Sequence, residues 1–500
     1  MRKAFKKILI ANRGEIAVRV IRACREMGII PAVVYSEADR KALHVRLAGE
    51  GYYIGDAAPA ESYLNIDKII HAAKECGADA VHPGYGFLAE DPRFVHRCEA
   101  EGLAFIGPPS SAMEAMSRKT ASRRIMKDAG VPIIPGTLKP LKDIRSLQEK
   151  AEEIGYPLLL KAAAGGGGKG LRLVRDPENL KSAFRMARSE ALSSFGDGAV
   201  YMERYIEEPH HIEIQILADR FGNCVWLGER ECSVQRRYQK VMEEAPSPFL
   251  DEGTRAEMGR VAVRAARAVG YRNAGTIEFV VDKNRNFYFL EMNTRLQVEH
   301  PVTEMVTGID LVKNQIRIAE GRRLKFSQRD IKVTGASIQC RIYAEDPYND
   351  FLPSPGKILY LRSPAGGPGL RYDNGTYQGY DVPLEYDPLL SKLISWGATR
   401  EEAMKRMLRA LSEYHVYGIK TTIPFFKRIL HHPTFIRGDY NTHFIAHLEK
   451  EEESLDPEEQ AAALIAAAIR CYREGRAAFA SGTGKRFSRW KHTGRKDALS

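Results

Sequence analysis

The sequence predicts a multi-domain α/β (α+β) protein. Three observations predict this class: apolar strands alternate with helices over residues 4–110, a run of glycines joins two short strands near residue 165, and strand-like segments dominate residues 207–445. Alternating strands and helices are typical of a parallel sheet covered by helices, whereas consecutive strands indicate a β-rich domain. Five hundred residues can bury several cores, so we expect two to four domains.

The N-terminal region, residues 1–116, is expected to hold a Rossmann-like parallel sheet. Its elements are strands at residues 5–12, 31–35, 80–82 and 105–106 and helices at residues 14–27 and 66–76. Only Gly14 follows the first strand, so the dinucleotide-binding fingerprint is absent. The Gly- and Pro-rich loop His82–Glu90 follows a strand, where α/β sheets place their ligands.

A linker helix within residues 117–135 leads to a small α/β unit, residues 136–206. Its strands at 156–161 and 171–174 are joined by four successive glycines, Gly165–Gly168, with Lys161 and Lys169 on either side. Glycines let backbone N–H groups converge on an anion. Gly170 stands where a Walker A loop needs Ser or Thr. We interpret the segment as a mobile lid over a phosphate, with a flexible linker as the alternative.

The remaining chain divides into three predicted regions. Residues 207–335 and 336–448 are β-rich, with helices near 251–269 and 401–413, and residues 449–500 form a tail with an Ala-rich helix at 457–479. Residues 461–500 hold nine Lys and Arg against two acids, so most of the net charge of +11 belongs to the tail. A disordered, solubilising tail and a docking element for an acidic partner are both possible interpretations.

Composition excludes several classes of protein. The basicity is a property of the tail, so we expect no nucleic acid partner. No stretch has the apolar length of a membrane span, and the N-terminus lacks the apolar core of a signal peptide. The seven cysteines are scattered and never spaced Cys-x-x-Cys, which favours a reducing compartment without a zinc site. We therefore expect a cytoplasmic protein that contacts no membrane.

The segment Glu291–Pro301 has the most informative pattern in the chain. Every odd position from 291 to 299 is charged or an amide, and the even positions from 292 to 298 are Met, Thr, Leu and Val. An extended chain points alternate side chains to opposite faces. One face is therefore predicted to align two carboxylates, a guanidinium and two amides: Glu291, Asn293, Arg295, Gln297 and Glu299.

A hairpin is predicted directly before this segment. Strands at 276–282 and 287–291 flank the turn 283–286, and pairing Asp282 with Phe287 places Glu278 opposite Glu291. Opposed like charges destabilise a sheet unless a cation lies between them. Oxygen ligands suit Mg²⁺ or Mn²⁺. With Asn293 on the same face, the pair predicts a metal site, and a solvated surface hairpin is the alternative.

The polar run Glu229–Lys240 is expected to form another strand. A solvated basic edge is the ordinary interpretation of such a run. However, Lys240 and Arg295 together could neutralise a small anion. This run is therefore a second candidate part of the site.

These motifs together resemble biotin carboxylase, an ATP-grasp enzyme, over roughly residues 3–447. The matching segments are Ile10–Ala17, His82–Leu88, the glycine lid, His211–Gln215, Gln235–Lys240, Glu291–Pro301, Arg341–Asp346 and Tyr386–Pro388. The resemblance implies an ATP-grasp core with a mobile lid and a β-rich C-terminal domain. It also implies a ligase that carboxylates biotin on a carrier protein with ATP, Mg²⁺ (or Mn²⁺) and bicarbonate.

The resemblance assigns roles to residues at matching positions. Nucleotide binding falls to Lys119, Lys161, Gly166, Gly167, Gly168, Glu203, Ile206, His211, Gln235 and Tyr238. Metal binding falls to Glu278, Glu291 and Asn293, and bicarbonate binding to Lys240, Arg295, Gln297 and Val298. Glu299 matches the base that deprotonates bicarbonate, Arg341 the cation that stabilises the biotin enolate, and Tyr85 lies near biotin. Lys240, Arg295, Glu299 and Arg341 form the expected catalytic set.

Departures from the family pattern leave this set intact. Tyr238 stands where His is usual, Tyr343 where Asn is common, and Ala163 with Ala164 where the lid usually has Ser-Gly. These changes affect the nucleotide contact at 238 and the stiffness of the lid.

The expected function is the first half-reaction of acetyl-CoA carboxylase. The chain shows no carboxyltransferase segment, and Ala403–Arg406 resembles a biotinylation motif only in part. We therefore expect a separate biotin carboxyl carrier protein, carboxyltransferase subunits and a homodimer. Pyruvate carboxylase or another acyl-CoA carboxylase is the alternative parent complex. Another ATP-grasp ligase and a scaffold with a decayed site are more remote alternatives.

Overall fold

The computed structural model describes residues 4–117, 119–137, 139–141, 144–162, 171–196, 198–364, 366–451, 461–462 and 464–472. The chain forms two compact units, residues 1–445 and 446–500. In the second unit, residues 461–462 and 464–472 are helical, as the Ala-rich pattern predicts. The docking role of the tail stays a prediction.

The N-terminal region folds as the predicted parallel sheet. Its strand order is β3-β2-β1-β4-β5, and every pairing is parallel. The strands are β1 (Lys7–Ile10), β2 (Ile30–Tyr35), β3 (Glu50–Tyr53), β4 (Ala80–His82) and β5 (Ala104–Phe105), and the helices are α1 (Gly14–Glu26), α2 (Leu43–Ala48), α3 (Ile66–Glu75) and α4 (Pro92–Ala100). Strand β3 and helices α2 and α4 are additions to the predicted elements, and all three are short.

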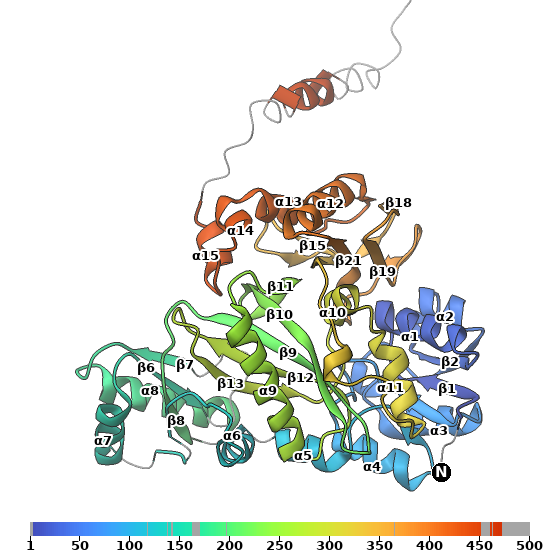
Figure 1. Ribbon diagram of the computed structural model, residues 1–500. Coiled ribbons are helices and arrows are strands. Elements are labelled where there is room, and N and C mark those ends of the chain that lie inside the picture. The colour runs from blue at the N-terminus through green and yellow to red at the C-terminus, as the bar shows by residue number, and fades with distance from the viewer. Residues whose placement is uncertain are drawn as a thin grey trace, which may run out of the picture. The chain divides into compact units, whose positions relative to one another are not determined.

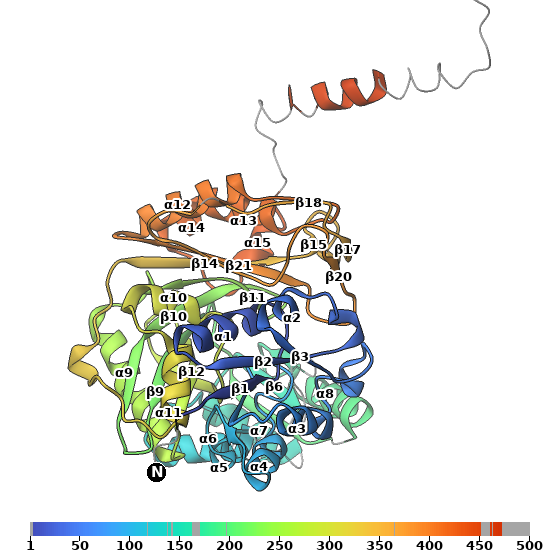
Figure 2. The ribbon, with the colours of Figure 1, turned by 90° about the vertical axis from the view of Figure 1, so that its right-hand side faces the viewer.

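Both faces of this sheet are covered, as the alternation of side chains along β1 requires. Ile8 and Ile10 belong to the core beneath α1, and Leu9 belongs to the opposite core with α3 and α4. Figure 2 shows α1 and α3 on opposite sides of the blue strands. Burial on both faces explains why the strand is apolar throughout instead of alternating. The carboxyl ends of β1 and β4 are thereby fixed in place.

The small α/β unit has its own sheet and core. Helices α5 (Ser110–Ser117) and α6 (Lys119–Asp128) precede it, and it contains α7 (Ile144–Ile154), β6 (Leu158–Ala162), β7 (Leu171–Val174), α8 (Leu180–Phe195) and β8 (Val200–Arg204). The antiparallel sheet β7-β6-β8 is drawn in teal in Figure 1. Leu158, Leu160, Phe184 and Met202 form its core. The lid glycines Gly166, Gly167 and Gly168 lie outside the described residues.

An eight-stranded sheet joins the two regions that the sequence separates at residue 335. Its order is β13-β12-β9-β10-β11-β14-β21-β19. The strands are β9 (His210–Ala218), β10 (Cys224–Arg236), β11 (Gln239–Ala245), β12 (Asn273–Val281), β13 (Phe287–Asn293), β14 (Ala336–Tyr343), β19 (Leu370–Asn374) and β21 (Leu389–Gly397). Because β11 pairs with β14, residues of the C-terminal region lie on the same sheet surface as those of β9 to β13.

Helices and short strands complete the first unit. The helices are α9 (Glu252–Ala268), α10 (His300–Thr307), α11 (Leu311–Ala319), α12 (Arg400–Glu413), α13 (Ile423–His431), α14 (Pro433–Arg437) and α15 (Phe444–Leu448), the last of which crosses the unit boundary. The short strands are β15 (Glu345–Asp346), β16 (Leu352–Pro353), β17 (Gly356–Lys357), β18 (Tyr360–Arg362), β20 (Asp381–Val382) and β22 (His415–Tyr417). The predicted helices at 251–269 and 401–413 correspond to α9 and α12.

The predicted single strand Glu229–Lys240 is wrong, because the run turns at Arg237 and Tyr238. Arg236 pairs with Gln239 across a two-residue turn. Arg237 and Tyr238 both have positive φ, at 50° and 66°. Turns of this kind normally use Gly, Asn or Asp at these positions, so the sequence contains no turn signal. The hairpin leaves Tyr238 72% exposed at its tip.

The Glu278–Glu291 pairing is confirmed, although the predicted register at the turn is wrong by one residue. Val281 pairs with Phe287, and the register shifts between Glu278 and Phe279. The extra residue on β13 is Leu290, since Phe279 pairs with Phe289 and Glu278 with Glu291. This β-bulge restores the predicted alignment of the two glutamates.

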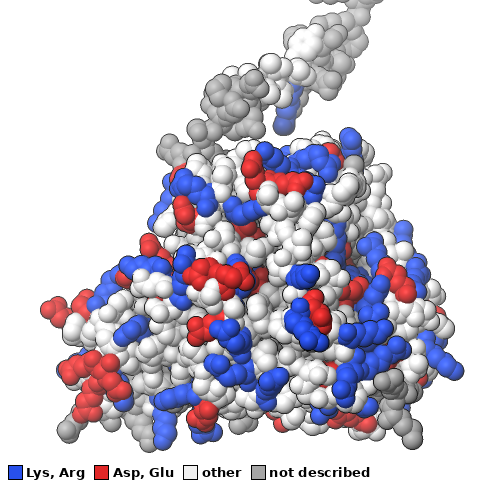
Figure 3. Space-filling model, viewed as in Figure 1, with Lys and Arg blue, Asp and Glu red and all other residues white. Residues whose placement is uncertain are grey.

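Charged side chains of both signs are scattered over the face of the molecule that Figure 3 draws, where Lys and Arg are interspersed with Asp and Glu. Across the described residues, no helix is both long enough and apolar enough to cross a lipid bilayer.

Two buried histidines of the N-terminal region should make folding pH-dependent. His44 and His82 are both fully buried. Burial, followed by the charge of Arg19, lowers the pKa of His82 to about 3 from its ordinary 6.5. Burial is also the main reason that the pKa of His44 falls to about 4. The unfolded chain therefore binds protons first as the pH falls through 6.5, and stability is lost progressively below that value.

We predict that His82→Gln reduces the loss of unfolding free energy between about pH 7.5 and pH 5 by about 2 kcal/mol. The unfolding of both proteins in urea at the two pH values measures this difference. His71→Gln, at a side chain that is 82% exposed, is the control. An equal loss in wild type and His82→Gln would contradict the prediction.

Candidate active site

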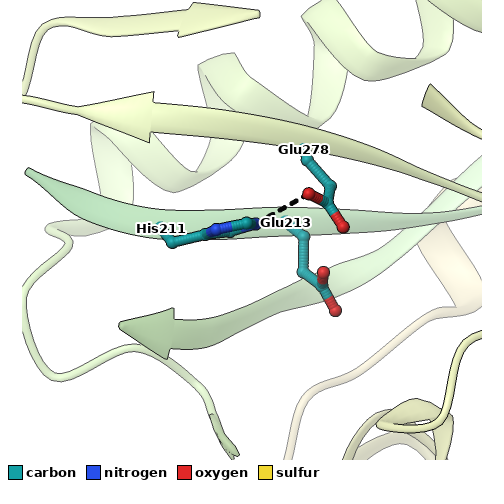
Figure 4. A group of neighbouring side chains, drawn as sticks. All are labelled: His211, Glu213 and Glu278. Carbon is teal, nitrogen blue, oxygen red and sulfur yellow. Dashed lines mark ion pairs between the residues drawn. The ribbon is translucent and has the colours of Figure 1, made fainter. Parts of the chain in front are cut away.

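Three glutamates stand side by side on neighbouring strands of the large sheet. Glu278 on β12 pairs with Glu213 on β9 and, on its other side, with Glu291 on β13. Glu213 and Glu278 are buried and Glu291 is exposed. Figure 4 shows His211 and Glu213 on the same strand, with His211 directed at Glu278. The His211 Nε2 atom lies 2.9 Å from a carboxylate oxygen of Glu278. Carboxylates in adjacent register repel one another, so the row requires nearby cations.

Lys240 supplies the central positive charge. Its Nζ lies 2.5 Å from an oxygen of Glu213 and 2.8 Å from one of Glu278. A third carboxylate, Glu299, lies 2.7 Å away. Burial lowers the pKa of Lys240, but the three carboxylates outweigh that effect and hold its pKa well above the ordinary range. The ammonium group is therefore a permanent charge that holds β9, β11, β12 and the 297–299 segment together.

Arg230 on β10 is a second cation that contacts the glutamate row. Its guanidinium is fully buried and donates to Glu213. Its other partners are Gln215, Thr276, Gln297 and Thr303. Arg230 donates a hydrogen bond to Oε1 of Gln297 at 2.9 Å, so the side-chain nitrogen of Gln297 faces Glu278 and donates to it at 2.7 Å. Arg230 thereby fixes the orientation of a predicted bicarbonate residue.

Glu299 lies between Lys240 and Arg341. Arg341 on β14 donates to the second oxygen of Glu299 at 3.0 Å. Burial raises the pKa of Glu299, but Lys240, Arg341 and Arg230 outweigh burial and hold its pKa well below the usual range. Glu299 is therefore ionised at neutral pH, which is the state that a general base requires.

Only the first part of the predicted polar strand, residues 291–293, is a strand in the structure. Strand β13 ends at Asn293, so the residues after it are not extended strand. Their side chains nevertheless converge, because Asn293 and Gln297 both donate to the same oxygen of Glu278, at 2.8 and 2.7 Å. Arg295 pairs with Glu90 at 2.7 Å and donates to Asn293 at 3.2 Å. Glu90 ends the Gly/Pro loop that the sequence singles out as a ligand-binding position.

A cavity of about 310 Å³ opens beside Arg341. It is lined by Tyr85, Val298 and Arg341 among the predicted site residues, and by residues of the segments 12–16 and 385–389. Tyr343, which departs from the family pattern, lines it too. The fully buried Lys392 donates to the Val298 carbonyl at 3.0 Å and pairs with Glu15 at 3.1 Å. Tyr85 donates to the same glutamate, so one buried ion pair joins two of the predicted substrate residues.

The predicted nucleotide residues are spread over two sheets. Lys161 on β6 pairs with Glu203 on β8 at 2.5 Å, and Arg123 also pairs with Glu203. Ile206 is half-buried two residues after β8. The side-chain amide of Gln235 hydrogen-bonds His211 at 2.8 Å, which links the nucleotide set to the glutamate row. Lys119 begins α6, and Tyr238 stays exposed at the hairpin tip.

The donor set around Glu278 fits a hard divalent cation. Glu278 and Glu291 are register partners, and Asn293 follows on the same strand as Glu291. Two carboxylates and a carboxamide are oxygen donors, which Mg²⁺ and Mn²⁺ prefer. His211, Glu213 and Glu278 also lie close enough to share an ion. Glu213 pairs with both Arg230 and Lys240, whereas Glu278 pairs with Lys240 but not with Arg230, so the group that includes Glu213 is the poorer metal site.

Sequence reasoning missed several charged partners of the site. Glu213, Arg230, Glu243 and Glu90 each pair with a predicted residue or its neighbour. The alternation of His211, Glu213 and Gln215 is a signal that could have placed Glu213 on the same face. Arg230 and Glu243 sit in polar runs whose pairing depends on the unpredicted hairpin at residue 237.

Comparison with known families covers nearly all of the first unit. A model described as biotin carboxylase, N-terminal domain, matches residues 4–113. The carbamoyl-phosphate synthase L chain ATP-binding domain matches residues 118–327, and the biotin carboxylase C-terminal domain matches residues 339–447. The chain is 55% identical to a pyruvate carboxylase subunit of Methanothermobacter thermautotrophicus, over 88% of this chain and 89% of that protein. It is 53% identical to biotin carboxylase 1 of Bacillus subtilis, over 88% and 98%.

Solved structures agree with these matches. A Campylobacter jejuni biotin carboxylase in complex with β,γ-ATP is 50% identical, with a TM-score of 0.84, over 89% of this chain and 99% of that one. The biotin carboxylase domain of Hydrogenobacter thermophilus 2-oxoglutarate carboxylase, a dimer with MgADP, ADP and bicarbonate, is 49% identical with the same TM-score, over 90% and 100%. The chain therefore belongs to the biotin carboxylase family of ATP-grasp ligases.

Proposed function

We propose that this biotin carboxylase uses ATP and bicarbonate to carboxylate biotin on a separate carrier protein. The observation on which the proposal rests is the set Lys240, Glu299 and Arg341, in which Glu299 and Arg341 are buried. Arg341 and Tyr85 line the adjacent cavity. A carboxylate held ionised between two cations can accept a proton, and the cations can hold small anions. The bicarbonate-bound relative from Hydrogenobacter thermophilus supports this choice of substrate.

The first step activates bicarbonate. Lys240, Arg295, Gln297 and the backbone of Val298 hold it, and Glu299 takes its proton. An oxygen of the resulting carbonate attacks the γ-phosphorus of ATP, the bond to the β-phosphate oxygen breaks, and ADP leaves as carboxyphosphate forms. Lys119, Lys161 and His211 offset the phosphate charge, and Glu203, Ile206, Gln235 and Tyr238 contact the nucleotide. We also assign nucleotide binding to Gly166, Gly167 and Gly168, which lie outside the described residues. Carboxyphosphate requires exclusion of water.

The second step transfers the carboxyl group to biotin. Carboxyphosphate splits into CO₂ and phosphate, the phosphate accepts the ureido N–H proton of biotin, and the nitrogen attacks CO₂. Negative charge develops on the ureido oxygen, and Arg341 stabilises it from the wall of the cavity. Tyr85 lines the same cavity and contacts the biotin ring.

Glu278, Glu291 and Asn293 would hold the divalent cation. Mg²⁺ or Mn²⁺ in this position supplies charge neutralisation for the transferring phosphoryl group. Asn293 and Gln297 orient Glu278 through hydrogen bonds to one of its oxygens, and His211 reaches the other.

We propose that the final acceptor is acetyl-CoA or pyruvate. The 55% identity to a subunit of pyruvate carboxylase favours pyruvate, whereas relatives named only biotin carboxylase reach 53% and 52% identity. A propionyl-CoA carboxylase alpha chain is 49% identical, so identity does not separate the acceptors. The proposed partners are a biotin carboxyl carrier protein, carboxyltransferase subunits and a second copy of this chain, the last supported by the dimeric relative.

The full chain with MgATP, labelled bicarbonate and free biotin tests the core proposal. We expect ATP cleavage that depends on bicarbonate and labelled carboxybiotin that depends on ATP. Absence of carboxybiotin, with or without added carrier protein, would overturn the proposed function. Addition of carrier and carboxyltransferase subunits with acetyl-CoA or pyruvate then identifies the acceptor.

We predict that Glu299→Gln lowers bicarbonate-dependent ATP cleavage by about 10²–10⁴-fold, because the general base is lost. MgATP binding, measured by calorimetry, should stay close to that of the wild type, since Glu299 is assigned no nucleotide contact. Near-normal turnover in Glu299→Gln would remove this residue from the mechanism.

We predict that Arg341→Ala lowers carboxybiotin formation by about 10²–10³-fold, because a preorganised cation is lost where charge develops. Biotin-independent ATP cleavage should fall far less, because bicarbonate activation is assigned to Lys240, Arg295 and Glu299. Parallel assays of the two activities measure the difference. Equal losses would contradict the assignment of Arg341 to the biotin step.

We predict that Glu278→Gln raises the Mg²⁺ concentration needed for half-maximal ATP cleavage by about tenfold or more, because one charged ligand is lost. The amide keeps the shape of the side chain, so the thermal unfolding midpoint checks that the fold persists. Glu252→Gln, at an exposed position on α9, is the control. An unchanged Mg²⁺ dependence would exclude Glu278 as a metal ligand.

A further inference from the structure

Arg341 has two carboxylate partners, and only one of them belongs to the proposed mechanism. Glu299 accepts from the outer nitrogen of the guanidinium at 3.0 Å. Glu243 on β11 accepts from Nε at 2.6 Å and also pairs with the outer nitrogen. Arg341 is thus clamped between a carboxylate that is assigned to proton transfer and one that has no role assigned so far.

Glu243 occupies a position that the sheet fixes on every side. It pairs directly with Gln339 across the β11–β14 ladder, and Arg341 lies two residues further along β14 on the same face. Gln339 donates to the second oxygen of Glu243 at 2.9 Å. Glu243 and Gln339 are 1% and 0% exposed. Neither residue lines the cavity that Arg341 lines, so Glu243 can influence a substrate there only through Arg341.

The charge of Arg341 needs a partner that does not change during the reaction. A buried guanidinium without a counter-charge is strongly unfavourable. If Glu299 accepts a proton from bicarbonate, it becomes neutral and its pairing with Arg341 weakens. Glu243 then remains as the second partner, and its contacts with Nε and the outer nitrogen keep the guanidinium plane in place.

We propose that Glu243 is a positioning residue that holds Arg341 toward biotin while Glu299 changes its protonation state. This inference rests on the proposed function and assigns Glu243 to the biotin step. Glu243 touches neither the reacting atoms nor the cavity, so its effect must pass through the guanidinium of Arg341.

The neighbouring residue provides a matched control. Glu244 is also buried, at 2% exposure, and points to the other side of the same strand. It pairs with Arg400 at 2.6 Å and accepts from Tyr440. Neither Arg400 nor Tyr440 has been assigned to the site. Removing its charge therefore perturbs a buried ion pair of the same strand without touching Arg341.

The test compares Glu243→Gln and Glu244→Gln in the wild-type chain and in Arg341→Ala. Carboxybiotin formation and bicarbonate-dependent ATP cleavage without biotin are measured for each protein. For Glu243→Gln we expect carboxybiotin formation to fall at least tenfold more than ATP cleavage, with a raised KM for biotin. Glu244→Gln should change the two activities in equal proportion. In the Arg341→Ala background, Glu243→Gln should have no further effect on carboxybiotin formation, because its target is gone.

Two results would overturn the proposal: an equal loss of both activities in Glu243→Gln, or a loss that persists unchanged in the Arg341→Ala background. If Glu243→Gln does not fold, Gln339→Leu takes its place, since it removes one contact of Glu243, and a smaller change of the same kind is expected. A wild-type chain that makes no carboxybiotin contradicts the proposed function itself. A wild-type chain that makes carboxybiotin beside a Glu243→Gln protein with an unchanged activity ratio contradicts only the positioning role.

Discussion

The ammonium group of Lys240 among three carboxylates is the interaction on which the site depends. Glu213, Glu278 and Glu299 all lie within 2.8 Å of its Nζ and are all buried. Removing the ammonium group would leave these carboxylates as uncompensated buried charges, and such a loss costs about 3–5 kcal/mol. The three carboxylates come from two strands and a loop, so the cluster forms only when the large sheet is complete. Assembly of the sheet and assembly of the site are therefore the same event.

Because the large sheet is continuous, Arg341 of the C-terminal region lies next to the proposed catalytic residues of the ATP-grasp region. The sequence separates a catalytic region from a C-terminal region at residue 335, yet β11 and β14 pair directly. Glu243 and Arg341 lie on opposite sides of this pairing and bind each other. Glu299, the proposed proton acceptor, binds the same guanidinium from the loop after β13. The shared sheet thus fixes the distance between Glu299, proposed for the bicarbonate step, and Arg341, proposed for the biotin step.

The sequence is sufficient for the elements whose pattern is local. The parallel N-terminal strands follow from apolar runs separated by amphipathic helices, and α9 and α12 follow from helical periodicity. The alignment of Glu278 with Glu291 is also correct, although the assumed turn register is off by one and a bulge at Leu290 compensates. Here two deviations cancel, and the sequence contains no signal that would reveal either.

The features of the fold and site that could not be predicted from the sequence depend on tertiary contacts or on atypical turns. The hairpin at Arg237 and Tyr238 uses positive φ without Gly or Asn, so the run from 229 to 240 has the pattern of one strand. Without that turn, Glu243 and Lys240 cannot be placed on the strand beside β14. The role of Arg230 also could not be predicted, because it depends on tertiary contacts: its five side-chain hydrogen bonds go to residues from four separate segments.

The sequence of this chain therefore predicts the groups proposed to contact substrate better than the groups that position them. The groups proposed to touch substrate lie in short motifs with a regular alternation, where the chemistry requires them. The groups that aim them, such as Arg230 for Gln297 and Glu243 for Arg341, are set by which strands become neighbours. A displacement of the Arg341 guanidinium by a fraction of an ångström would weaken its proposed interaction with the charge on biotin, because electrostatic stabilisation depends on preorganised donors. The rigidity of the β11–β14 ladder is thus itself a part of the proposed catalysis.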